Sequence, residues 1–469
     1  GSVPVSKTWY FAEGKVGGGF TEYMTIENPD PVHACHVNIQ YLLSSGSVAP
    51  IAVIVNPTTR FTETVNNDLK TPASGNAQIV STIVAVDPAD TGCQGVVAER
   101  PMYFVNFMGV SSGSDVVGAT STGTNFYFAD MPTLLGYNTY ITILNPSSSN
   151  AANITVNYYA GGKLVGTQAQ SVPANSRGTI IPTRFTQRVE AVVTSDSPVV
   201  IERPSYFSGI NAGNAGTVTG AASVIGAQNP ASDWRFAEGY TGGQFQEYLM
   251  LANFGTSDTT AQVVLEYTNG HTQTISVRVA AQSQAVLDVN ASNAHPGGIC
   301  DVSPCQVTSE VSAEITGGSN IVTEREMFFH YTDGHGLNAV GGTDVTGMIA
   351  SSASAYTFAE GYTNTGYNEW LTLQNPTGNA ETISVLLVNG LGHSYSQEFL
   401  MAAHSRFTVN ITSMVAQNLV NSGEGYQAYE VSMIVQSSSG AFVAERPMYW
   451  DTGMQGTQGG SDVIGYSGI

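Results

Sequence analysis

Glutamate and arginine recur at equivalent places along this sequence, and they are the side chains most able to do chemistry. The stretch from Ala98 to Phe104 reads AERPMYF, and it returns at residues 201–207 (IERPSYF), 323–329 (TEREMFF) and 444–450 (AERPMYW). We call this stretch the closing box; its arginines are Arg100, Arg203, Arg325 and Arg446. Other acids recur upstream, as Glu13, Glu238 and Glu360, with Asp130 in the second copy, and as Glu22, Glu247 and Glu369, with Thr139 in the second copy. Two carboxyl groups that flank a bond can hydrolyse a glycoside.

A structural role explains these residues better than catalysis. One chain rarely needs four nearly equal active sites, and the second copy loses a glutamate to Thr139 without other signs of decay. The planar guanidinium group pairs well with carboxylates. We therefore expect ion pairs that hold strands together, formed by Arg100, Arg203, Arg325 and Arg446 with Glu13, Glu22, Glu238, Glu247, Glu360 and Glu369. The sequence has no phosphate-binding loop, zincin helix or nucleophile elbow, so we expect no enzyme.

The closing boxes divide the chain into four repeats of roughly 100 to 120 residues, the size of small domains. We place the repeats at residues 1–119, 120–227, 228–348 and 349–469. Each begins with an opening box such as Trp9–Gly14 (WYFAEG) and continues with an alternating segment such as Glu22–Pro29, in which Met24 and Ile26 share one face. Each ends in a tail such as Gly113–Ala119.

This pattern predicts an all-β protein of four tandem β-sandwich repeats of immunoglobulin-like size, with about seven strands each. The alternative is one large closed β-structure in which the four repeats share sheets. Short connections between repeats argue against free tumbling, so we expect a rod or a compact curved array.

Composition limits the classes of partner. Only 11% of the 469 residues are charged, 51 are glycine, and the formal net charge is −21. This charge argues against nucleic-acid binding, which needs clustered lysine and arginine. No apolar run is long enough to span a membrane. Gly1-Ser2 could be a cloning remnant, so the native start stays open.

The four cysteines fall in pairs within repeats, which suggests the disulfides Cys35–Cys93 and Cys300–Cys305 and an oxidising, extracellular location. A zinc site at His33–His36 is a weaker alternative, because the spacing lacks a second ligand pair. Metal ligands could also lie in the stretch from His330 to His335. Binding of calcium at acidic loops stays an open alternative, although no EF-hand pattern is present.

The aromatic residues have two interpretations. Tyr103, Phe104 and their equivalents are expected in cores and interfaces, whereas Tyr240 and Tyr362, beside glycine turns, could stack on sugar rings. Three glycosylation sequons occur, at Asn153, Asn290 and Asn410.

Together the boxes FAEG, EY(L/M)xLxNP, ERPMYF and DVIG resemble a repeat found in large secreted or surface proteins of actinobacteria and Chloroflexi-type bacteria. The resemblance covers all four repeats and implies an extracellular bacterial protein. The family has no settled activity, so it implies no site residues. The second repeat departs most from the pattern, at Asp130, Thr139 and Ser205, and its tail lacks the aspartate.

Three functions follow as hypotheses. The first is a non-catalytic structural subunit of an extracellular filament, sheath or surface layer. Chains would associate head to tail through the contact that joins repeats, or by donating a terminal strand near Val3 and Val5. The second is an adhesin or carbohydrate-binding protein that binds cell-surface glycans, with the repeats providing avidity. A hydrolase is the third and is ranked last.

Overall fold

The computed structural model describes residues 3–293, 298–334, 336–350, 353–438, 440–452 and 456–468. The fold is all-β, as predicted. Gly1 and Ser2 lie outside the described residues, as does His335 of the predicted histidine-rich stretch. Among the helices of these ranges, none is long and apolar enough to cross a membrane.

Repeat 1 forms two five-stranded sheets, in the orders β1-β9-β4-β5 with β6 on β4, and β10-β3-β11-β12 with β7 on β3. A small pair, β2-β8, lies beside them. The elements are β1 (Thr8–Phe11), β2 (Lys15–Val16), β3 (Phe20–Asn28), β4 (Cys35–Leu43), β5 (Gly46–Ser47), β6 (Ile51–Val55), β7 (Thr59–Thr64), α1 (Val65–Asp68), β8 (Gln78–Ile79), β9 (Ser81–Val86), β10 (Val97–Glu99), β11 (Met102–Phe107) and β12 (Val110–Ser114).

Repeat 2 is joined into one eight-stranded sheet by β19, a 22-residue strand that pairs with β13 and β16 in its first half and with β14, β15 and β20 in its second. The elements are β13 (Gly123–Phe128), β14 (Tyr137–Thr139), β15 (Ile141–Asn145), β16 (Ala152–Ala160), β17 (Lys163–Val172), β18 (Ser176–Ile180), β19 (Glu190–Asn211), the 3₁₀ turn η1 (Gly213–Ala215) and β20 (Thr217–Ile225).

Repeat 3 has the same plan, with the 22-residue strand β27 at the centre of a nine-stranded sheet. The elements are β21 (Ala231–Phe236), β22 (Phe245–Asn253), β23 (Thr259–Tyr267), β24 (Thr272–Val279), β25 (Ser283–Asp288), α2 (Val289–Asn293), β26 (Ile299–Cys300), β27 (Val311–Thr332), β28 (Asn338–Thr346) and β29 (Met348–Ile349).

Repeat 4 has two four-stranded sheets, β30-β35-β32-β33 and β34-β31-β36-β37. The elements are β30 (Ala355–Phe358), β31 (Tyr367–Asn375), β32 (Glu381–Asn389), β33 (Ser394–Met401), β34 (Ser405–Asn410), α3 (Ile411–Asn418), the 3₁₀ turn η2 (Tyr426–Ala428), β35 (Val431–Ser437), β36 (Val443–Asp451) and β37 (Gln458–Ile464).

Local sequence explains the long strands near the start of each repeat. In β4, Cys35, Val37, Ile39 and Tyr41 alternate into the core, as the period-two pattern requires. The asparagine before the predicted strand stop is fully buried, and the Nδ2 atom of Asn28 donates to the carbonyls of His33, Val55 and Asn56. Asn145, Asn253 and Asn375 make equivalent bonds, so this asparagine ties the end of its strand to the loop that follows and to the end of a later strand.

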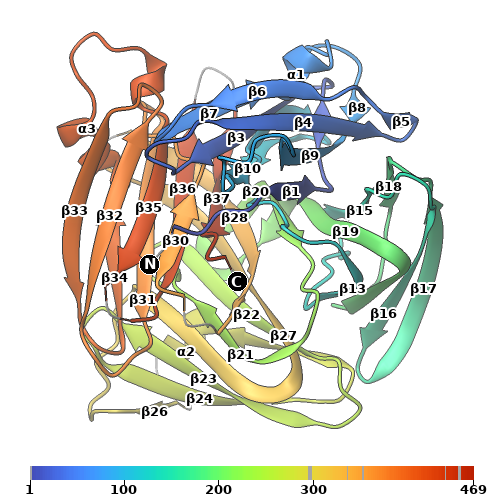
Figure 1. The fold of residues 1–469 in the computed structure, drawn as a ribbon. Helices are drawn as coiled ribbons and strands as arrows, with labels where there is room; N and C mark the ends of the chain where they lie inside the picture. The colour runs from blue at the N-terminus through green and yellow to red at the C-terminus, as the bar shows by residue number, and fades with distance from the viewer. Residues whose placement is uncertain are drawn as a thin grey trace.

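The four repeats follow one another around a centre and close on themselves (Figure 1). The tail strands β12, β20, β28 and β37 pack against one another there, with β37 against β12 as well as β28. Glycine permits this close approach: a Cβ atom on Gly341 would lie 3.2 Å from the Cα atom of Gly459. A straight rod is therefore excluded, and the compact curved array closes into a ring, since repeat 4 contacts repeat 1.

Closure does not merge the repeats into shared sheets, which was the alternative expectation. Each sheet takes its strands from one repeat, and only β29 extends a residue past the predicted boundary. The largest apolar clusters are likewise centred in single repeats, around residues such as Trp9, Phe128, Trp234 and Tyr356, and two of them extend to an alanine of the preceding repeat, Ala129 or Ala359. Contacts between the sheets of neighbouring repeats therefore hold the ring together.

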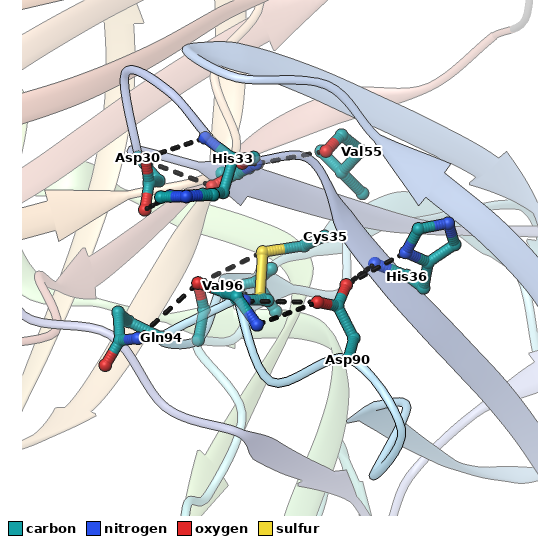
Figure 2. Close-up of a disulfide and its surroundings, with 12 residues drawn as sticks. Asp30, His33, Cys35, His36, Val55, Asp90, Gln94 and Val96 are labelled. Carbon is teal, nitrogen blue, oxygen red and sulfur yellow. Dashed lines mark hydrogen bonds and ion pairs between the residues drawn. A yellow bond between two sulfur atoms is a disulfide. The ribbon is translucent and has the colours of Figure 1, made fainter.

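The structure contains both predicted disulfides. Cys35 pairs with Cys93 and Cys300 pairs with Cys305, with Cα–Cα distances of 5.1 and 5.5 Å. Figure 2 shows the first bond beside His36, whose Nδ1 atom lies 2.9 Å from Asp90 Oδ2. Because Cys35 is oxidised and His36 pairs with Asp90, the zinc alternative at His33–His36 is wrong.

Candidate functional site

The closing-box arginines form four equivalent buried clusters at the junctions between successive repeats. Each guanidinium Nη1 atom donates to the backbone carbonyl of the opening-box acid in its own repeat. These pairs are Arg100 with Glu13, Arg203 with Asp130, Arg325 with Glu238 and Arg446 with Glu360. All four arginines are almost completely buried. The recurring acid therefore accepts this arginine's hydrogen bond through its main-chain carbonyl group.

The carboxylate partner of each arginine comes from the next repeat. Arg100 Nη1 lies 3.2 Å from Glu202 Oε2, Arg203 Nη1 lies 2.7 Å from Glu324 Oε2, and Arg325 Nη2 lies 2.9 Å from Glu445 Oε2. Arg446 Nη2 completes the cycle, 3.1 Å from Glu99 Oε2 in repeat 1. Each glutamate stands immediately before an arginine in the closing box. The Glu-Arg dipeptide of each repeat therefore contacts the preceding repeat through its glutamate and the next repeat through its arginine.

The same glutamates also accept from the backbone of the preceding opening box. Their Oε1 atoms lie 2.6 to 2.8 Å from alanine N–H groups: Ala12 for Glu202, Ala129 for Glu324, Ala237 for Glu445 and Ala359 for Glu99. A hydrogen bond to a charged acceptor is stronger than one between neutral groups. Each glutamate thus joins two segments of the preceding repeat to its own.

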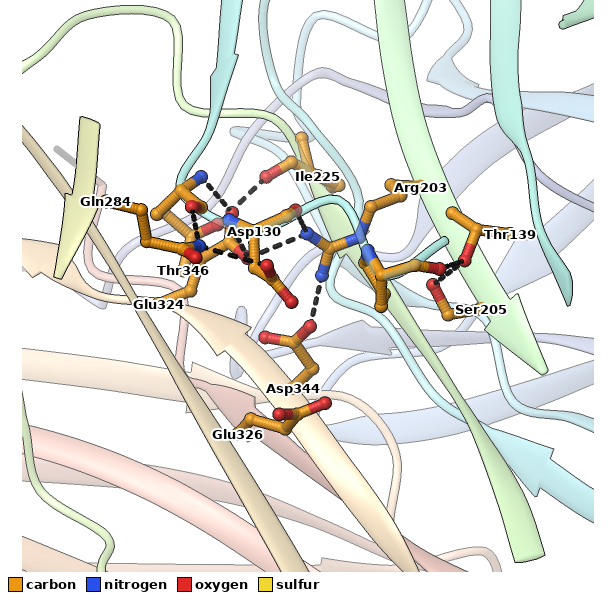
Figure 3. A network of polar contacts seen from close by, with 12 residues as sticks. Asp130, Thr139, Arg203, Ser205, Ile225, Gln284, Glu324, Glu326, Asp344 and Thr346 are labelled. Atoms are coloured by element: carbon orange, nitrogen blue, oxygen red, sulfur yellow. Dashed lines mark hydrogen bonds and ion pairs between the residues drawn. The ribbon is translucent and has the colours of Figure 1, made fainter. Parts of the chain in front are cut away.

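An aspartate from the tail completes three of the clusters. Arg446 pairs with Asp115, Arg203 with Asp344 and Arg325 with Asp462. Figure 3 shows the second junction, where Arg203 reaches both Asp130 and Asp344. At the first junction the tail has Ser223 instead, and its hydroxyl donates to Glu202 Oε2 at 3.3 Å.

A second set of arginines pairs with the side chains of the opening-box acids. Arg177 Nη2 lies 3.4 Å from Glu13 Oε2, and Arg406 Nη2 lies close to Glu238 Oε2. Arg60 pairs with Glu360 in the same way. These arginines come from β7, β18 and β34, the strands next to the Asn-containing strand of the following repeat.

The second junction replaces this arginine with a different one. Gln284 stands where the other repeats have arginine, and its Nε2 atom donates to Asp130 Oδ1 at 2.9 Å. Arg188 supplies the missing charge and reaches Asp130 at 2.8 Å and Glu326 at 3.2 Å. Glu326 itself replaces the proline of the closing box, so Gln284 and Glu326 belong to one local rearrangement.

The prediction that Glu22, Glu247 and Glu369 form ion pairs is wrong. Across the described ranges, no arginine or lysine side-chain nitrogen lies within 4.0 Å of a carboxylate oxygen of these three glutamates, so they form no ion pair. Instead Glu22 Oε2 accepts from the Lys15 N–H at 2.7 Å, and its carboxyl group packs on the opening-box glycine. A Cβ atom on Gly14 would lie 2.7 Å from Glu22 Oε1.

This packing explains why two positions of repeat 2 changed together. Gly239 and Gly361 face Glu247 and Glu369 in the same way as Gly14 faces Glu22. Repeat 2 has Met131 at the glycine position and Thr139 at the glutamate position. Any side chain at the first position collides with a glutamate at the second, so the smaller threonine accompanies the methionine.

Burial dominates the electrostatics of these carboxyl groups. It raises the pKa of Glu22, Glu247 and Glu369 to about 8, and nearby arginines only partly oppose the effect. Burial also raises the pKa of Glu99 and Asp462 well above the usual range. In both of these clusters a second carboxyl group contacts the same arginine, so Arg446 meets Glu99 and Asp115, and Arg325 meets Glu445 and Asp462.

This arrangement suits adhesion between repeats better than acid–base chemistry. A glycosidase needs two carboxyl groups that a sugar can reach, whereas Glu22, Glu99 and their equivalents are almost completely buried. Sequence reasoning found the arginines but missed Glu99, Glu202, Glu324 and Glu445 as their partners. The signal was present, because this glutamate recurs in all four closing boxes next to the arginine.

The predicted metal and aromatic positions have other partners. His330 Nε2 lies 3.0 Å from Asn338 Oδ1, and no group of three or more potential metal-ligating side chains occurs within the described ranges. Tyr240 and Tyr362 are half-buried and pack edge-on against Phe245 and Tyr367, with ring centroids 4.9 and 4.8 Å apart. The sequon residue Asn290 donates to the Phe245 carbonyl at 2.8 Å, so that side chain is already engaged.

Comparison with known proteins shows only weak structural similarity. No family model and no curated protein matches the chain. A Thermotoga maritima protein designated 1070 is similar over 25% of this chain and 96% of its own, with 14% identity and a TM-score of 0.20. The pilus backbone of Streptococcus pneumoniae matches over 57% and 82% (12% identity, TM-score 0.11), and a tetra-tandem repeat of a large adhesion protein matches over 94% and 93% (8% identity, TM-score 0.11).

Proposed function

We propose that this protein is a non-catalytic, extracellular structural protein of a bacterial surface, built as a closed ring of four β-sandwich repeats of immunoglobulin-like size. The observation that carries the proposal is the unbroken cycle of buried arginine–glutamate contacts, which returns from Arg446 to Glu99. Nearly all the recurring charges are used inside the molecule. Two disulfides add support for an oxidising location.

Closure changes how such a protein would assemble. The predicted head-to-tail contact between chains copies the contact between repeats, but all four copies of that contact are made within one chain. The segment near Val5 is also engaged, since Ser6 bridges to Val96 and Val5 packs with the core of repeat 1. We therefore propose that any filament or layer forms through the outer faces of the rings.

The carbohydrate-binding alternative is less well supported. Tyr240 and Tyr362, the aromatics expected to stack on sugars, pack edge-on against neighbouring rings. Weak binding of glycans through other surfaces stays a prediction, and a glycan array together with cell-wall polysaccharide pull-down tests it.

Circular permutation tests the ring. Pro4 and Gly468 lie close together, because a Cβ atom on Gly468 would be 3.2 Å from Pro4 Cβ. Joining the ends with a short linker and opening the chain between repeats 2 and 3, near Gln228, keeps every junction intact. We expect this permutant to melt within a few degrees of the parent, and class averages from electron microscopy to show four-lobed rings.

An open array predicts a different result. In an open array repeats 4 and 1 are not in contact, so the linker of the permutant would hold them apart and micrographs would show extended particles. The Glu99→Ala substitution would then leave the melting temperature unchanged. Either result would contradict the ring. The same micrographs, taken over a range of concentrations with and without calcium, show whether rings associate.

A further inference from the structure

A cavity of about 290 Å³ lies at the junction between repeats 3 and 4. Its volume is close to the lower end of the range for small-molecule pockets, roughly 300 to 1,000 Å³. Aromatic side chains from both repeats form much of its wall: Tyr240, Phe245 and Tyr331 from repeat 3, and Trp370 and Tyr449 from repeat 4.

These rings form one packed cluster. Tyr331 stacks on Tyr449 with centroids 4.3 Å apart, and Tyr449 meets Phe245 edge-on at 6.0 Å. Asn368 donates to the Tyr331 hydroxyl at 2.7 Å, which fixes that ring across the junction. The wall is therefore held in place before any ligand binds.

The polar side of the cavity has a net negative charge. Arg406 lies between Glu238 and Glu310, whose carboxylates it contacts through different Nη atoms. Glu238 is buried, whereas 38% of the Glu310 side chain is exposed, and the Glu310 Oε2 atom takes both Arg406 and the Thr408 hydroxyl. Two carboxylates and one guanidinium group disfavour an anionic ligand.

The equivalent cluster between repeats 1 and 2 already contains a cation. Lys15 follows the opening-box glycine there, at the position that Tyr240 has in repeat 3. Its Nζ atom lies 4.4 Å from the centroid of Phe20 and 3.8 Å from that of Phe107. Phe20 is the counterpart of Phe245, and both clusters include the tyrosine of the next closing box, Tyr206 or Tyr449.

We propose that the cavity between repeats 3 and 4 binds an alkylammonium group, such as a quaternary trimethylammonium head or the end of a lysine side chain. Aromatic faces attract cations, and tryptophan and tyrosine do so more strongly than phenylalanine. At the first junction the protein fills the site with its own ammonium group. At the third junction Tyr240 leaves that place open, while the acidic side is strengthened by Glu310. This inference goes beyond the proposed structural role and does not depend on it.

The test titrates the intact protein with choline and with its neutral carbon isostere, dimethylbutanol, by calorimetry. We expect choline to bind with millimolar affinity and the isostere to bind at least about tenfold more weakly. A second titration uses an Nα-acetyl-lysine ester, which keeps the side-chain ammonium group. Comparing its affinity with that of choline shows whether the cavity prefers the end of a lysine side chain or a quaternary head. Equal binding of choline and dimethylbutanol, or binding of neither, would overturn the proposal.

Three variants sharpen the test. Tyr240→Lys supplies a tethered ammonium group, as Lys15 does, and should abolish choline binding without lowering the melting temperature. Glu310→Gln should weaken choline binding about tenfold. Its matched control is Glu430→Gln, at the equivalent position of repeat 4, which should leave the affinity unchanged. If folded Tyr240→Lys binds choline as well as the parent, the ligand does not occupy this cavity.

Discussion

The first and third junctions differ in one residue that faces the arginine. At the first, Arg100 meets Glu202, and the Ser223 hydroxyl donates to that glutamate. At the third, Arg325 meets both Glu445 and Asp462. One junction thus uses a hydroxyl group where the other uses a second carboxyl group.

The difference shows what this position requires. A serine hydroxyl can always donate a hydrogen bond to the neighbouring glutamate, whereas an aspartate can do so only when protonated. Burial raises the pKa of Asp462 well above its usual range and that of Asp344 to about 7, which is consistent with a retained proton. The position therefore accepts either a neutral hydroxyl group or a carboxyl group whose charge depends on pH.

Removing the arginine of the third junction should have the largest effect. Arg325→Ala leaves Glu445 and Asp462 buried without their cation, and loss of one partner from a buried pair costs about 3 to 5 kcal/mol. We expect the free energy of unfolding, measured by urea denaturation, to fall by this amount.

The control for this variant is an exposed ion pair. The Arg278 side chain is 77% exposed and pairs with Asp258, so Arg278→Ala should cost less than about 1 kcal/mol. Similar losses in the two variants would show that the buried cluster contributes little to stability.

Raising the pH should destabilise the whole protein. Glu22, Glu27, Glu247, Glu266 and Glu369 have pKa values raised to about 8 by burial, from an ordinary value of 4.5. The folded protein then binds more protons than the unfolded chain between these values, so the free energy of unfolding falls as pH rises through this interval. We expect calorimetry to show a melting temperature several degrees lower at pH 9 than at pH 5. A melting temperature that rises over this interval would contradict the assignment.

Exchanging the tail aspartate and serine between the two junctions should give the smallest but most specific change in stability. Asp462→Ser gives the third junction the hydroxyl group of the first, and we expect it to flatten the dependence of stability on pH. Ser223→Asp does the reverse and should steepen it, by at most about 1.4 kcal/mol per pH unit, the slope that one additional titrating group contributes. Denaturation at several pH values measures both slopes. If the two variants change the slope in the same direction, the serine and the protonated aspartate are not equivalent.

Part of this organisation follows from the sequence alone. Alternating apolar residues such as Met24 and Ile26 predicted the β-strands of an all-β fold, and the division into four repeats rests on the four closing boxes. Cysteines within single repeats predicted both disulfides. These properties depend on neighbours in sequence or on residue types, and period-two burial is local to each strand.

The partners of the recurring charges depended on the tertiary structure. Arg100 and Glu13 recur together, but the side chain of Glu13 pairs with Arg177 of the next repeat, while Arg100 pairs with Glu202. Recurrence shows that a residue matters in every repeat, and it does not distinguish a contact within a repeat from a contact with the next. The prediction for Glu22 failed for a different reason: its partners are the Lys15 backbone N–H and the surface of Gly14, and recurrence does not distinguish an ion pair from such contacts.

Closure of the ring was likewise decided only in three dimensions. A repeat that presents a Glu-Arg dipeptide with complementary surfaces on two sides is compatible with a rod, an open arc or a ring. The angle between successive repeats selects among them, and that angle is set by the packing of β12, β20, β28 and β37 around the centre. Small residues such as Gly341 and Gly459 allow that approach, but their role is visible only once the four tails meet.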